Sequence, residues 1–295
     1  MTKESPPICS YEGSDYQESF WEKGDRAYED AVEAIALKRL LPSTGKWMLE
    51  LGAGAGRNTP RYGGFEHVIL LDYSTTQLTQ AQARLGRSDR YRYVAADIYH
   101  LPFVDGFFDS ATMVRTLHHM ADAPTALSQV EHVLHTDSTF ILEFANKRNL
   151  KSIARYLTGR QKWDPFSLKQ VEFEKLNFDF HPRTIRKMLQ DLNFKIQKSL
   201  TVSHFRMRWL KQHIPLNLLV GLDSLLQWNG SWSQYTPSVF VKSTLKSNKP
   251  KAKQGTFFKC PACGSLELDE QNEAVICGKC KRKYPILNGI YDFRI

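Results

Sequence analysis

The sequence predicts an α/β fold in which a mixed β-sheet carries helices on both faces and is followed by a small cysteine-rich unit. Short apolar runs near residues 47–51, 67–72 and 91–95 alternate with helix-like segments, which is the pattern of a parallel sheet. Each run ends in an acid or a glycine turn, and two Cys-x-x-Cys pairs lie near the C-terminus. The 295 residues suffice for one α/β domain of about two hundred residues and an appendage.

The other elements follow in chain order. A helix is expected over about 26–40, after the aromatic pair Phe20 and Trp21 and before Pro42. A second helix is expected over about 182–192. Further strands are expected near residues 108–114, 138–144, 195–203 and 238–243, which brings the number of strands to seven.

A glycine-rich turn follows the first strand, in the string MLELGAGAG. Gly52, Gly54 and Gly56 allow a sharp turn and let a ligand lie against the bare main chain. A dinucleotide-binding loop would have a further glycine where this chain has Arg57. Glu50, at the end of the strand, suits a ligand with a positive ammonium better than one with phosphates. The loop therefore predicts an adenosine-containing cofactor other than a dinucleotide.

This string resembles the glycine motif of class I S-adenosylmethionine-dependent methyltransferases, and LDYS and AADIYHLPF resemble that family's next two motifs. The stretch FDSATMVRTLHHMADAP, followed by STFILEF, is similar to the methyltransferase type 11 group. The resemblance covers residues 15–145 densely and 175–242 loosely. It implies a Rossmann-like seven-stranded mixed sheet with its last strand inserted antiparallel. It also implies S-adenosylmethionine as the cofactor and methyl transfer as the reaction.

The resemblance further implies which residues hold the cofactor. Asp72 would accept hydrogen bonds from the ribose hydroxyls and Asp97 from the adenine amino group, while Glu50 would lie near the methionine ammonium. A helix N-cap is the alternative role for either aspartate, because both follow strands at turns that lead into predicted helices. The full predicted set is Glu50, Gly52, Ala53, Gly54, Gly56, Asp72, Tyr73, Asp97, Ile98 and Arg115.

The candidate catalytic residues are His118 and His119, which follow the fourth predicted strand. A histidine there could accept a proton from the acceptor or simply shape the wall of the pocket. A general base is needed only if the acceptor must lose a proton early. The sequence lacks the Pro-Pro-aromatic motif of exocyclic amino methyltransferases and the Pro-Cys nucleophile of pyrimidine carbon-5 enzymes, which disfavours DNA base methylation.

Two knuckles, CPAC and CGKC, place Cys260, Cys263, Cys277 and Cys280 at metal-ligand spacing. Four thiolates form a closed tetrahedral site, so one structural zinc is expected. Two disulfides are the alternative. They require an oxidising compartment, which the unpaired Cys9 and an N-terminus without an apolar signal core disfavour, so a cytoplasmic location is expected.

The tail CKRKYPILNGIYDF resembles the zinc-ribbon activator subunit of tRNA and protein methyltransferases, with Asn288 and Tyr291 departing from the usual residues. This resemblance implies a protein- or RNA-docking surface. The predicted organisation is a methyltransferase domain over 1–243, a basic linker over 244–256 and a zinc ribbon over 257–295. A cap helix is expected within 15–46 and a lid insertion within 204–236. The lysine-rich linker predicts a loosely tethered ribbon.

The net charge of +9 is uneven, and residues 147–162 carry many Lys and Arg and no acid. Leucines 218, 222, 225 and 226 of the insertion suit a lid, a helix lying on a membrane surface, or a helix packed on the sheet edge. No apolar run approaches the roughly twenty residues of a membrane span.

Three functions fit the sequence. The first is a methyltransferase with a small-molecule acceptor, and the second is a methyltransferase for tRNA or rRNA that docks through its basic segments and its ribbon. The third is a non-catalytic zinc-ribbon adaptor. The intact glycine loop and both aspartates disfavour the adaptor.

Overall fold

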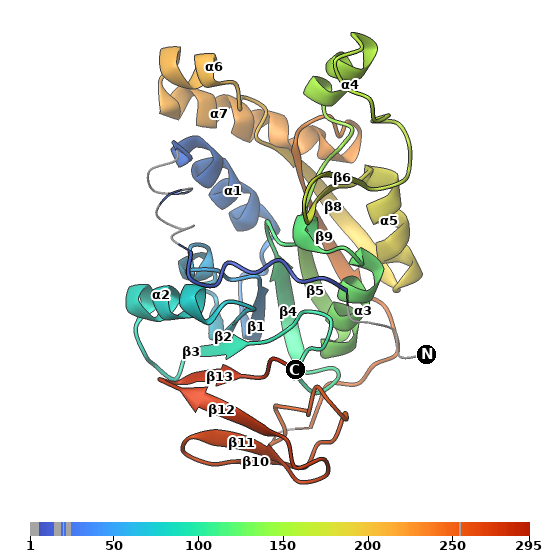
Figure 1. The fold of residues 1–295 in the computed structure, drawn as a ribbon. Coiled ribbons are helices and arrows are strands. Elements are labelled where there is room, and N and C mark those ends of the chain that lie inside the picture. Colours follow the sequence, from blue (N-terminus) through green and yellow to red (C-terminus); the bar gives the residue numbers. More distant parts are fainter. Residues whose placement is uncertain (1–5, 15–18, 20, 22–24, 254) are drawn as a thin grey trace.

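The structure is a computed structural model that describes residues 6–14, 19, 21, 25–253 and 255–295 (Figure 1). Phe20 and much of the predicted cap segment before residue 25 lie outside the described residues. The helix expected over about 26–40 is α1 (Ala27–Leu40), and Leu41 ends it with an extended backbone. The helix expected over about 182–192 is α5 (Pro182–Asp191), with Pro182 in its first turn.

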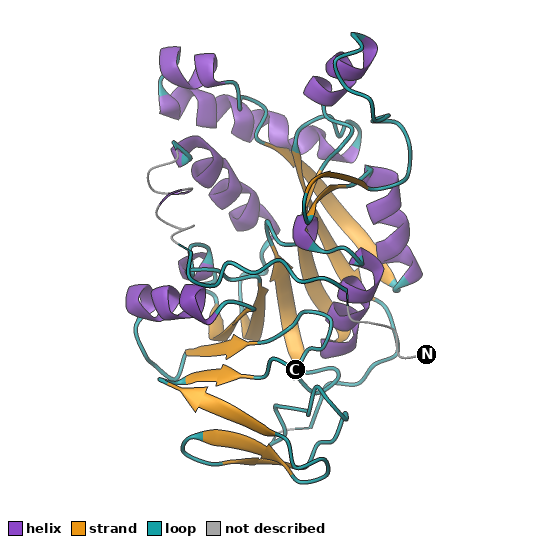
Figure 2. Ribbon diagram, viewed as in Figure 1, coloured by secondary structure: helices purple, strands orange, loops and turns teal. Residues whose placement is uncertain are grey.

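Seven strands form the core of the main sheet in the order β3-β2-β1-β4-β5-β9-β8 (Figure 2). Neighbours from β3 to β5 are parallel, whereas β9 is antiparallel to both β5 and β8. Each matches a strand expected from the sequence. Their bounds are β1 (Gly45–Leu51), β2 (Phe65–Asp72), β3 (Tyr91–Ala95), β4 (Phe108–Met113), β5 (Leu134–Ala145), β8 (Phe194–Val202) and β9 (Ser238–Leu245).

The prediction of a seven-stranded sheet is wrong, because the C-terminal unit adds four strands to make eleven. β13 pairs in parallel with β3, with Ile290 opposite Tyr93 and Asp292 opposite Ala95. Without β13, the backbone of β3 would be an unpaired sheet edge. The added strands are β10 (Leu268–Glu270), β11 (Ala274–Cys277), β12 (Lys283–Leu287) and β13 (Ile290–Asp292).

Helices cover both faces of the sheet, as expected. Side chains on neighbouring strand positions point to opposite faces. Leu49 and Ile69 belong to the core that includes residues of α3 (Ala123–Val133) and α5, whereas Met48 and Val68 pack in the core that includes residues of α2 (Thr75–Leu85). α1 packs in a third cluster with β8 and α7 (Leu216–Leu226).

Three helices and a hairpin lie beyond the end of the sheet opposite the ribbon (Figure 1). They are α4 (Leu150–Leu157), α6 (Arg208–His213), α7, and the antiparallel pair β6 (Val171–Glu174) and β7 (Asn177–Asp179). Short 3-10 helices are η2 (Thr59–Arg61), η3 (Leu117–His119) and η4 (Gln227–Ser231). None of the helices in the described residues has the length and apolar character needed to cross a bilayer.

The segment predicted to be a loose linker is bound to the sheet, so the prediction of a loose tether is contradicted. β9 continues to Leu245. The amide of Thr136 donates to the carbonyl of Lys249, the Thr136 hydroxyl accepts from the Lys249 amide, and the Lys249 ammonium lies 2.9 Å from a Glu131 carboxylate oxygen. The amide of Ala252 donates to the carbonyl of Gly106. These contacts order the linker along the domain surface.

Candidate functional site

A cavity of about 980 Å³, open to solvent, lies where β1, β2, β3 and β4 end. Eight of the ten predicted cofactor residues line it. Trp21 of the predicted cap segment also lines it, and so do Ile8 and Tyr11 of the N-terminal segment, whose roles sequence reasoning did not identify. Glu50 and Gly56 are not among the lining residues. The eight residues are Gly52, Ala53, Gly54, Asp72, Tyr73, Asp97, Ile98 and Arg115.

The three loop glycines have positive φ angles but meet different surroundings. A Cβ at Gly52 would lie 2.1 Å from the Thr116 hydroxyl oxygen, and one at Gly56 would lie 2.9 Å from Leu85. At Gly54 the nearest atom would be the side-chain oxygen of Gln77, 3.9 Å away. That oxygen is buried and has no hydrogen-bond partner among the described residues. Gly54 therefore borders open space next to an uncommitted acceptor, which fits a bound ligand with a hydrogen-bond donor.

Asp72 and Asp97 both bind the backbone of the turn that follows their strand. Asp72 accepts from the amides of Gly54 at 2.8 Å and Ser74 at 2.9 Å. Burial raises the pKa of Asp72 although these amides oppose the shift. Asp97 accepts from the Tyr99 amide at 2.9 Å, and a second oxygen lies 2.8 Å from Nδ1 of His100. Neither aspartate is a helix N-cap, because Ser74 caps α2 and no helix follows Asp97 directly.

The carboxylate of Glu50 is bound within the protein. It accepts hydrogen bonds from the hydroxyls of Thr59 at 2.6 Å and Tyr62 at 3.3 Å. Burial raises the pKa of Glu50 to about 7, against the opposing effect of these hydrogen bonds. The structure thus separates Glu50 from the residues that face the cavity.

A buried carboxylate on α1 organises two arginines of the cavity wall. The Nε of Arg115 donates to Glu33 at 2.6 Å, and Arg57 donates to the other Glu33 oxygen at 2.9 Å. Burial alone would raise the pKa of Glu33, but the two guanidinium charges outweigh it and lower the pKa. Trp21 packs against Arg57, with its ring centroid 3.5 Å from the guanidinium carbon. Sequence reasoning missed Glu33, although its place on the apolar face of the helix, beside Val32 and Leu37, marks it as a buried acid.

The two candidate catalytic histidines, both on η3, face different spaces. His119 lines the first cavity, with Nε2 3.1 Å from the Tyr11 hydroxyl and Nδ1 3.2 Å from the carbonyl of Leu176. Because a carbonyl can only accept, Nδ1 carries the proton and Tyr11 donates to Nε2. His118 lines a second cavity, and neither of its ring nitrogens hydrogen-bonds to a described residue. Burial, followed by the charges of His119, Arg115 and Arg206, lowers the pKa of His118, so the ring is neutral.

The second cavity, which is open to solvent and has about 660 Å³ of empty space, shares Arg115 with the first. Asp179, at the end of β7, lines it, and its carboxylate makes no hydrogen bond or ion pair with any described residue. Burial raises the pKa of Asp179 to about 6, although the charges of Lys147 and Arg206 oppose the shift. Sequence reasoning missed Asp179 and Arg206, because neither belongs to a recognisable motif and only the fold brings them to Arg115.

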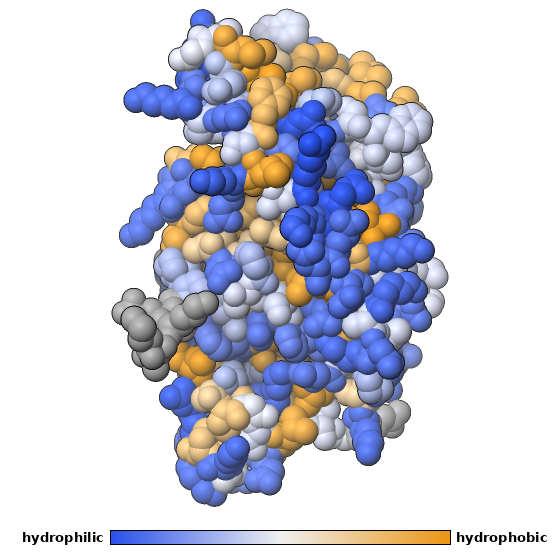
Figure 3. All heavy atoms as spheres, turned by 90° about the vertical axis from the view of Figure 1, so that its right-hand side faces the viewer, coloured by the Kyte–Doolittle hydropathy of each residue, from blue (hydrophilic) through white to orange (hydrophobic). Residues whose placement is uncertain are grey.

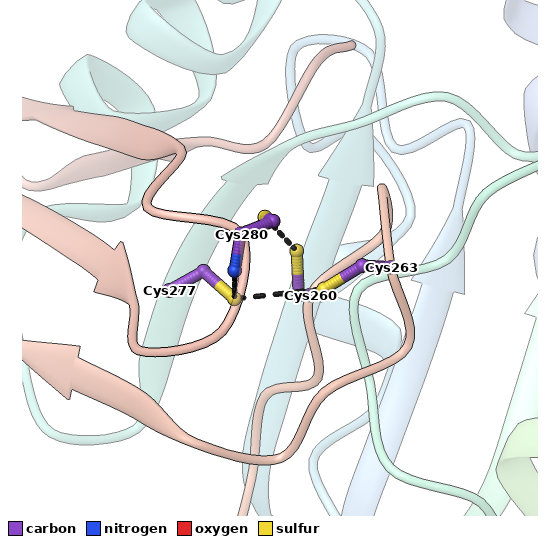
Figure 4. Close-up of side chains that lie close together, drawn as sticks. All are labelled: Cys260, Cys263, Cys277 and Cys280. Carbon is purple, nitrogen blue, oxygen red and sulfur yellow. Dashed lines mark hydrogen bonds between the residues drawn. The ribbon is translucent and has the colours of Figure 1, made fainter.

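The four predicted metal ligands converge in the ribbon (Figure 4). All four Sγ atoms lie within 4.8 Å of one another. The Cys260–Cys280 sulfurs are 3.7 Å apart and the Cys263–Cys277 sulfurs 3.6 Å. Zinc–sulfur bonds of about 2.3 Å place tetrahedral thiolates about 3.8 Å apart. The amide of Cys280 also points at the Cys277 sulfur, 3.4 Å away. The cluster therefore fits a tetrahedral ion such as zinc, and none of these cysteines is in a disulfide.

Comparisons with known proteins agree with this geometry. A family model described as a methyltransferase domain matches residues 49–142. An O-methyltransferase of Penicillium expansum, cnsE, is 30% identical over 135 residues, which cover 42% of this chain and 48% of the relative. A demethylmenaquinone methyltransferase of Clavibacter sepedonicus is 29% identical over 115 residues, which cover 38% and 47%. The chain thus spans about half the length of these curated relatives.

Solved structures match over more of the chain at lower identity. An S-adenosylmethionine-dependent methyltransferase from Listeria monocytogenes has a TM-score of 0.55 and 18% identity, covering 75% of this chain and 99% of that chain. A chain from the Haloferax volcanii complex between the Trm112 methyltransferase activator and a methyltransferase has a TM-score of 0.54 and 16% identity, covering 79% and 96%. Residues 49–142 therefore match a methyltransferase domain, within a chain that has the fold of S-adenosylmethionine-dependent methyltransferases.

Proposed function

We propose that this protein transfers a methyl group from S-adenosylmethionine to a small-molecule acceptor bound in the second cavity. The observation that carries the proposal is the junction of the two cavities at Arg115. The first cavity has the glycine loop and the two strand-end aspartates that suit the cofactor. The second has polar, titratable walls and is large enough for a compact acceptor. A methyl donor in one and an acceptor in the other would meet beside Arg115.

Cofactor binding would use groups that the fold already orients. Asp72 and Asp97 each hold backbone amides, and each carboxylate retains lone pairs for the ribose hydroxyls and the adenine amino group. The bare main chain at Gly54 leaves space for the methionine part. Glu50 would act on the ammonium only through intervening groups, because its side chain faces Thr59 and Tyr62.

Methyl transfer from a sulfonium is an in-line displacement, so orientation can supply much of the acceleration. If the acceptor must lose a proton, His118 is the better base of the two histidines, because it is neutral and its nitrogens are uncommitted. His119 has both nitrogens occupied and serves to shape the cofactor cavity. Asp179 would orient an acceptor hydroxyl or amine.

The relatives support a small-molecule acceptor. They include two fungal O-methyltransferases, a demethylmenaquinone methyltransferase and a 2-phytyl-1,4-naphtoquinone methyltransferase. For the ribbon, we propose one structural zinc on the four cysteines and a built-in activator role through the β13–β3 pairing. A chain similar to this one comes from a complex with a separate activator, which supports that role.

Calorimetry tests cofactor binding first. The protein should bind S-adenosylmethionine and S-adenosylhomocysteine but not NAD. Asp72→Ala should lose on the order of 1.5–3 kcal/mol of cofactor binding, because ribose hydroxyls lose a charged acceptor. Unchanged affinity in the variant, or tight binding of NAD, would contradict the assignment.

Transfer is tested by incubating the protein with radiolabelled S-adenosylmethionine and cell extract, and then separating RNA, protein and small molecules. Label should enter the small-molecule pool. His118→Gln should reduce turnover more than cofactor affinity, whereas the exposed His132→Gln serves as a matched control. Label that enters RNA instead would favour the RNA methyltransferase.

A further inference from the structure

We propose that α4 and the segment from α6 to η4 form a docking face for an anionic lipid bilayer. The docking face comprises residues 150–173 and 207–232, which form the end of the molecule opposite the ribbon (Figure 1). It combines exposed apolar side chains with uncommitted cations. These two features are the requirements for a protein to rest on a charged membrane surface.

Large apolar side chains are exposed on this face far more than elsewhere. Of the eighteen exposed large hydrophobic residues among those described, fifteen belong to the docking face. Leu157 and Leu225 expose 73% and 72% of their surface. Scattered exposed leucines are ordinary, but a concentration at one end of a molecule marks an interaction site. Figure 3 shows apolar and strongly hydrophilic surface side by side at this end.

The orientation of α7 shows that these leucines are not core residues. Leu219 and Asp223 face inward, and the Tyr28 hydroxyl donates to Asp223 at 2.6 Å. Leu218, Leu222 and Leu225 lie on a different stripe, at i, i+4 and i+7 spacing, and are exposed. Packing of α7 on the sheet edge, one of the roles expected from the sequence, thus explains Leu219 and Asp223 but not the exposed leucines.

α4 packs against the rest of the protein only at its first turn. Ser152 is the one buried residue of α4, and Asn149 caps the helix by accepting from its amide. Leu150 and Leu157 are exposed, as are Lys151 and Arg155. An eight-residue helix of this kind is marginal in water without a packing surface, so a bilayer interface would supply the apolar contact it lacks.

Charge complementarity identifies the occupant. Six cations on this face, Lys151, Arg155, Arg160, Lys162, Lys169 and Arg208, form no ion pair with any described residue. Four of them lie between residues 147 and 162, a stretch without any acid, and Asp164 and Glu172 are the acids of the first segment of the face. Each Lys or Arg near an anionic leaflet contributes on the order of 1 kcal/mol of attraction. The mixture of free cations and leucines fits anionic phospholipid.

The docking face also borders the mouth of a series of adjoining cavities that leads toward the cofactor cavity. A third cavity is lined by Lys151, Arg155 and Arg208. It shares Asn149 and Arg206 with the second cavity, which in turn shares Arg115 with the first. Docking would place this mouth against the lipid, so a lipid-soluble acceptor could enter without crossing water. This last step rests on the proposed function, whereas docking itself does not.

The test is co-sedimentation of the full chain with vesicles, without cofactor or acceptor. Vesicles of phosphatidylcholine with phosphatidylglycerol should bind the protein, pure phosphatidylcholine should bind it weakly, and added salt should reduce binding. Leu157→Glu with Leu225→Glu should weaken binding by about tenfold or more. The matched control is Leu266→Glu with Leu287→Glu, which changes charge equally at residues that are 58% and 59% exposed on the ribbon.

Calorimetry with S-adenosylhomocysteine, together with unchanged melting, shows whether each variant is folded. Equal loss of vesicle binding in both double variants would overturn the proposal, and so would no binding to anionic vesicles. A different outcome would assign the face to self-association. In that case the protein forms dimers in sedimentation velocity, Leu225→Glu dissociates them, and vesicles do not bind the protein. Because vesicle binding is measured without turnover, its failure is distinguishable from failure of the methyltransferase proposal.

Discussion

Arg294 of the ribbon lies over Tyr73 of the cofactor cavity. The guanidinium carbon is 5.6 Å from the centroid of the tyrosine ring, and one nitrogen donates to the Tyr73 carbonyl at 3.3 Å. Asp292 holds the guanidinium from the ribbon side at 2.6 Å, and Glu12 approaches it at 3.3 Å. The carboxylate of Glu12 also accepts from the amide of Thr75, the first residue of α2. The ribbon thus contacts both Tyr73 in the wall of the cavity and the N-terminal segment that lines it.

Replacing Arg294 with alanine should weaken binding of S-adenosylmethionine by about threefold to tenfold, because Tyr73 and Glu12 lose a charged hydrogen-bond partner. Calorimetry measures the affinity. Lys283→Ala removes an exposed cation elsewhere on the ribbon and is the matched control. Equal affinities in the two variants would show that the contact does not support the cavity.

The glycine loop predicts two separable defects. Gly54→Val should abolish most cofactor binding while the protein still folds, because a side chain there enters open space. Gly52→Ala should lower the melting temperature, because its Cβ would collide with Thr116. Both positions have positive φ, so backbone strain of about 1–2 kcal/mol is common to the two variants. Melting curves and calorimetry separate the two effects, and identical behaviour of the variants would contradict the assignment.

Removal of metal should destabilise the whole chain and not the ribbon alone. β13 completes the edge of β3, and the amide of Phe293 donates to the carbonyl of Ala95 at 2.7 Å. Loss of the ribbon would expose the β3 backbone. Chelation should therefore lower the main melting transition and promote aggregation.

Metal analysis provides the control for that experiment. The protein should carry one zinc, Cys277→Ser should lose it, and Cys9→Ser should retain it because Cys9 lies outside the cluster. An unchanged melting transition of the cofactor domain after chelation would contradict this prediction and show that the ribbon folds independently.

Glu50 should make stability depend on pH. Its pKa is about 7 in the folded protein, above the ordinary value of 4.5. Between those values the folded state holds a proton that the unfolded state has lost. The contribution of Glu50 to stability therefore falls as pH rises, by up to about 1.4 kcal/mol per pH unit. Denaturant unfolding between pH 5 and pH 7 should show this slope in the native protein and a smaller one in Glu50→Gln. Parallel slopes would show that Glu50 ionises normally.

The sequence predicted the elements whose side-chain pattern is local. The strands that end at Leu51, Asp72 and Ala95 follow from apolar runs, and the ends of four neighbouring strands place eight cofactor residues on one cavity. The sheet edge was not predicted, because pairing of β13 with β3 depends on complementarity between segments about 200 residues apart. Asp179 was missed for the same reason. It reaches the second cavity through the β6–β7 hairpin, which has no strong strand pattern of its own.

Because β13 and β3 belong to one chain, association of the ribbon with the cofactor domain is a unimolecular step. Separate polypeptides associate in proportion to their concentrations, whereas segments on one chain face an effective concentration that the linker sets. Here the linker is itself hydrogen-bonded along the domain, at Thr136 and Gly106, which narrows the positions the ribbon can reach. Dilution cannot separate the two parts, and a free ribbon from another protein must displace the resident one to reach β3. Each chain therefore carries one ribbon for one cofactor domain, whatever the protein concentration.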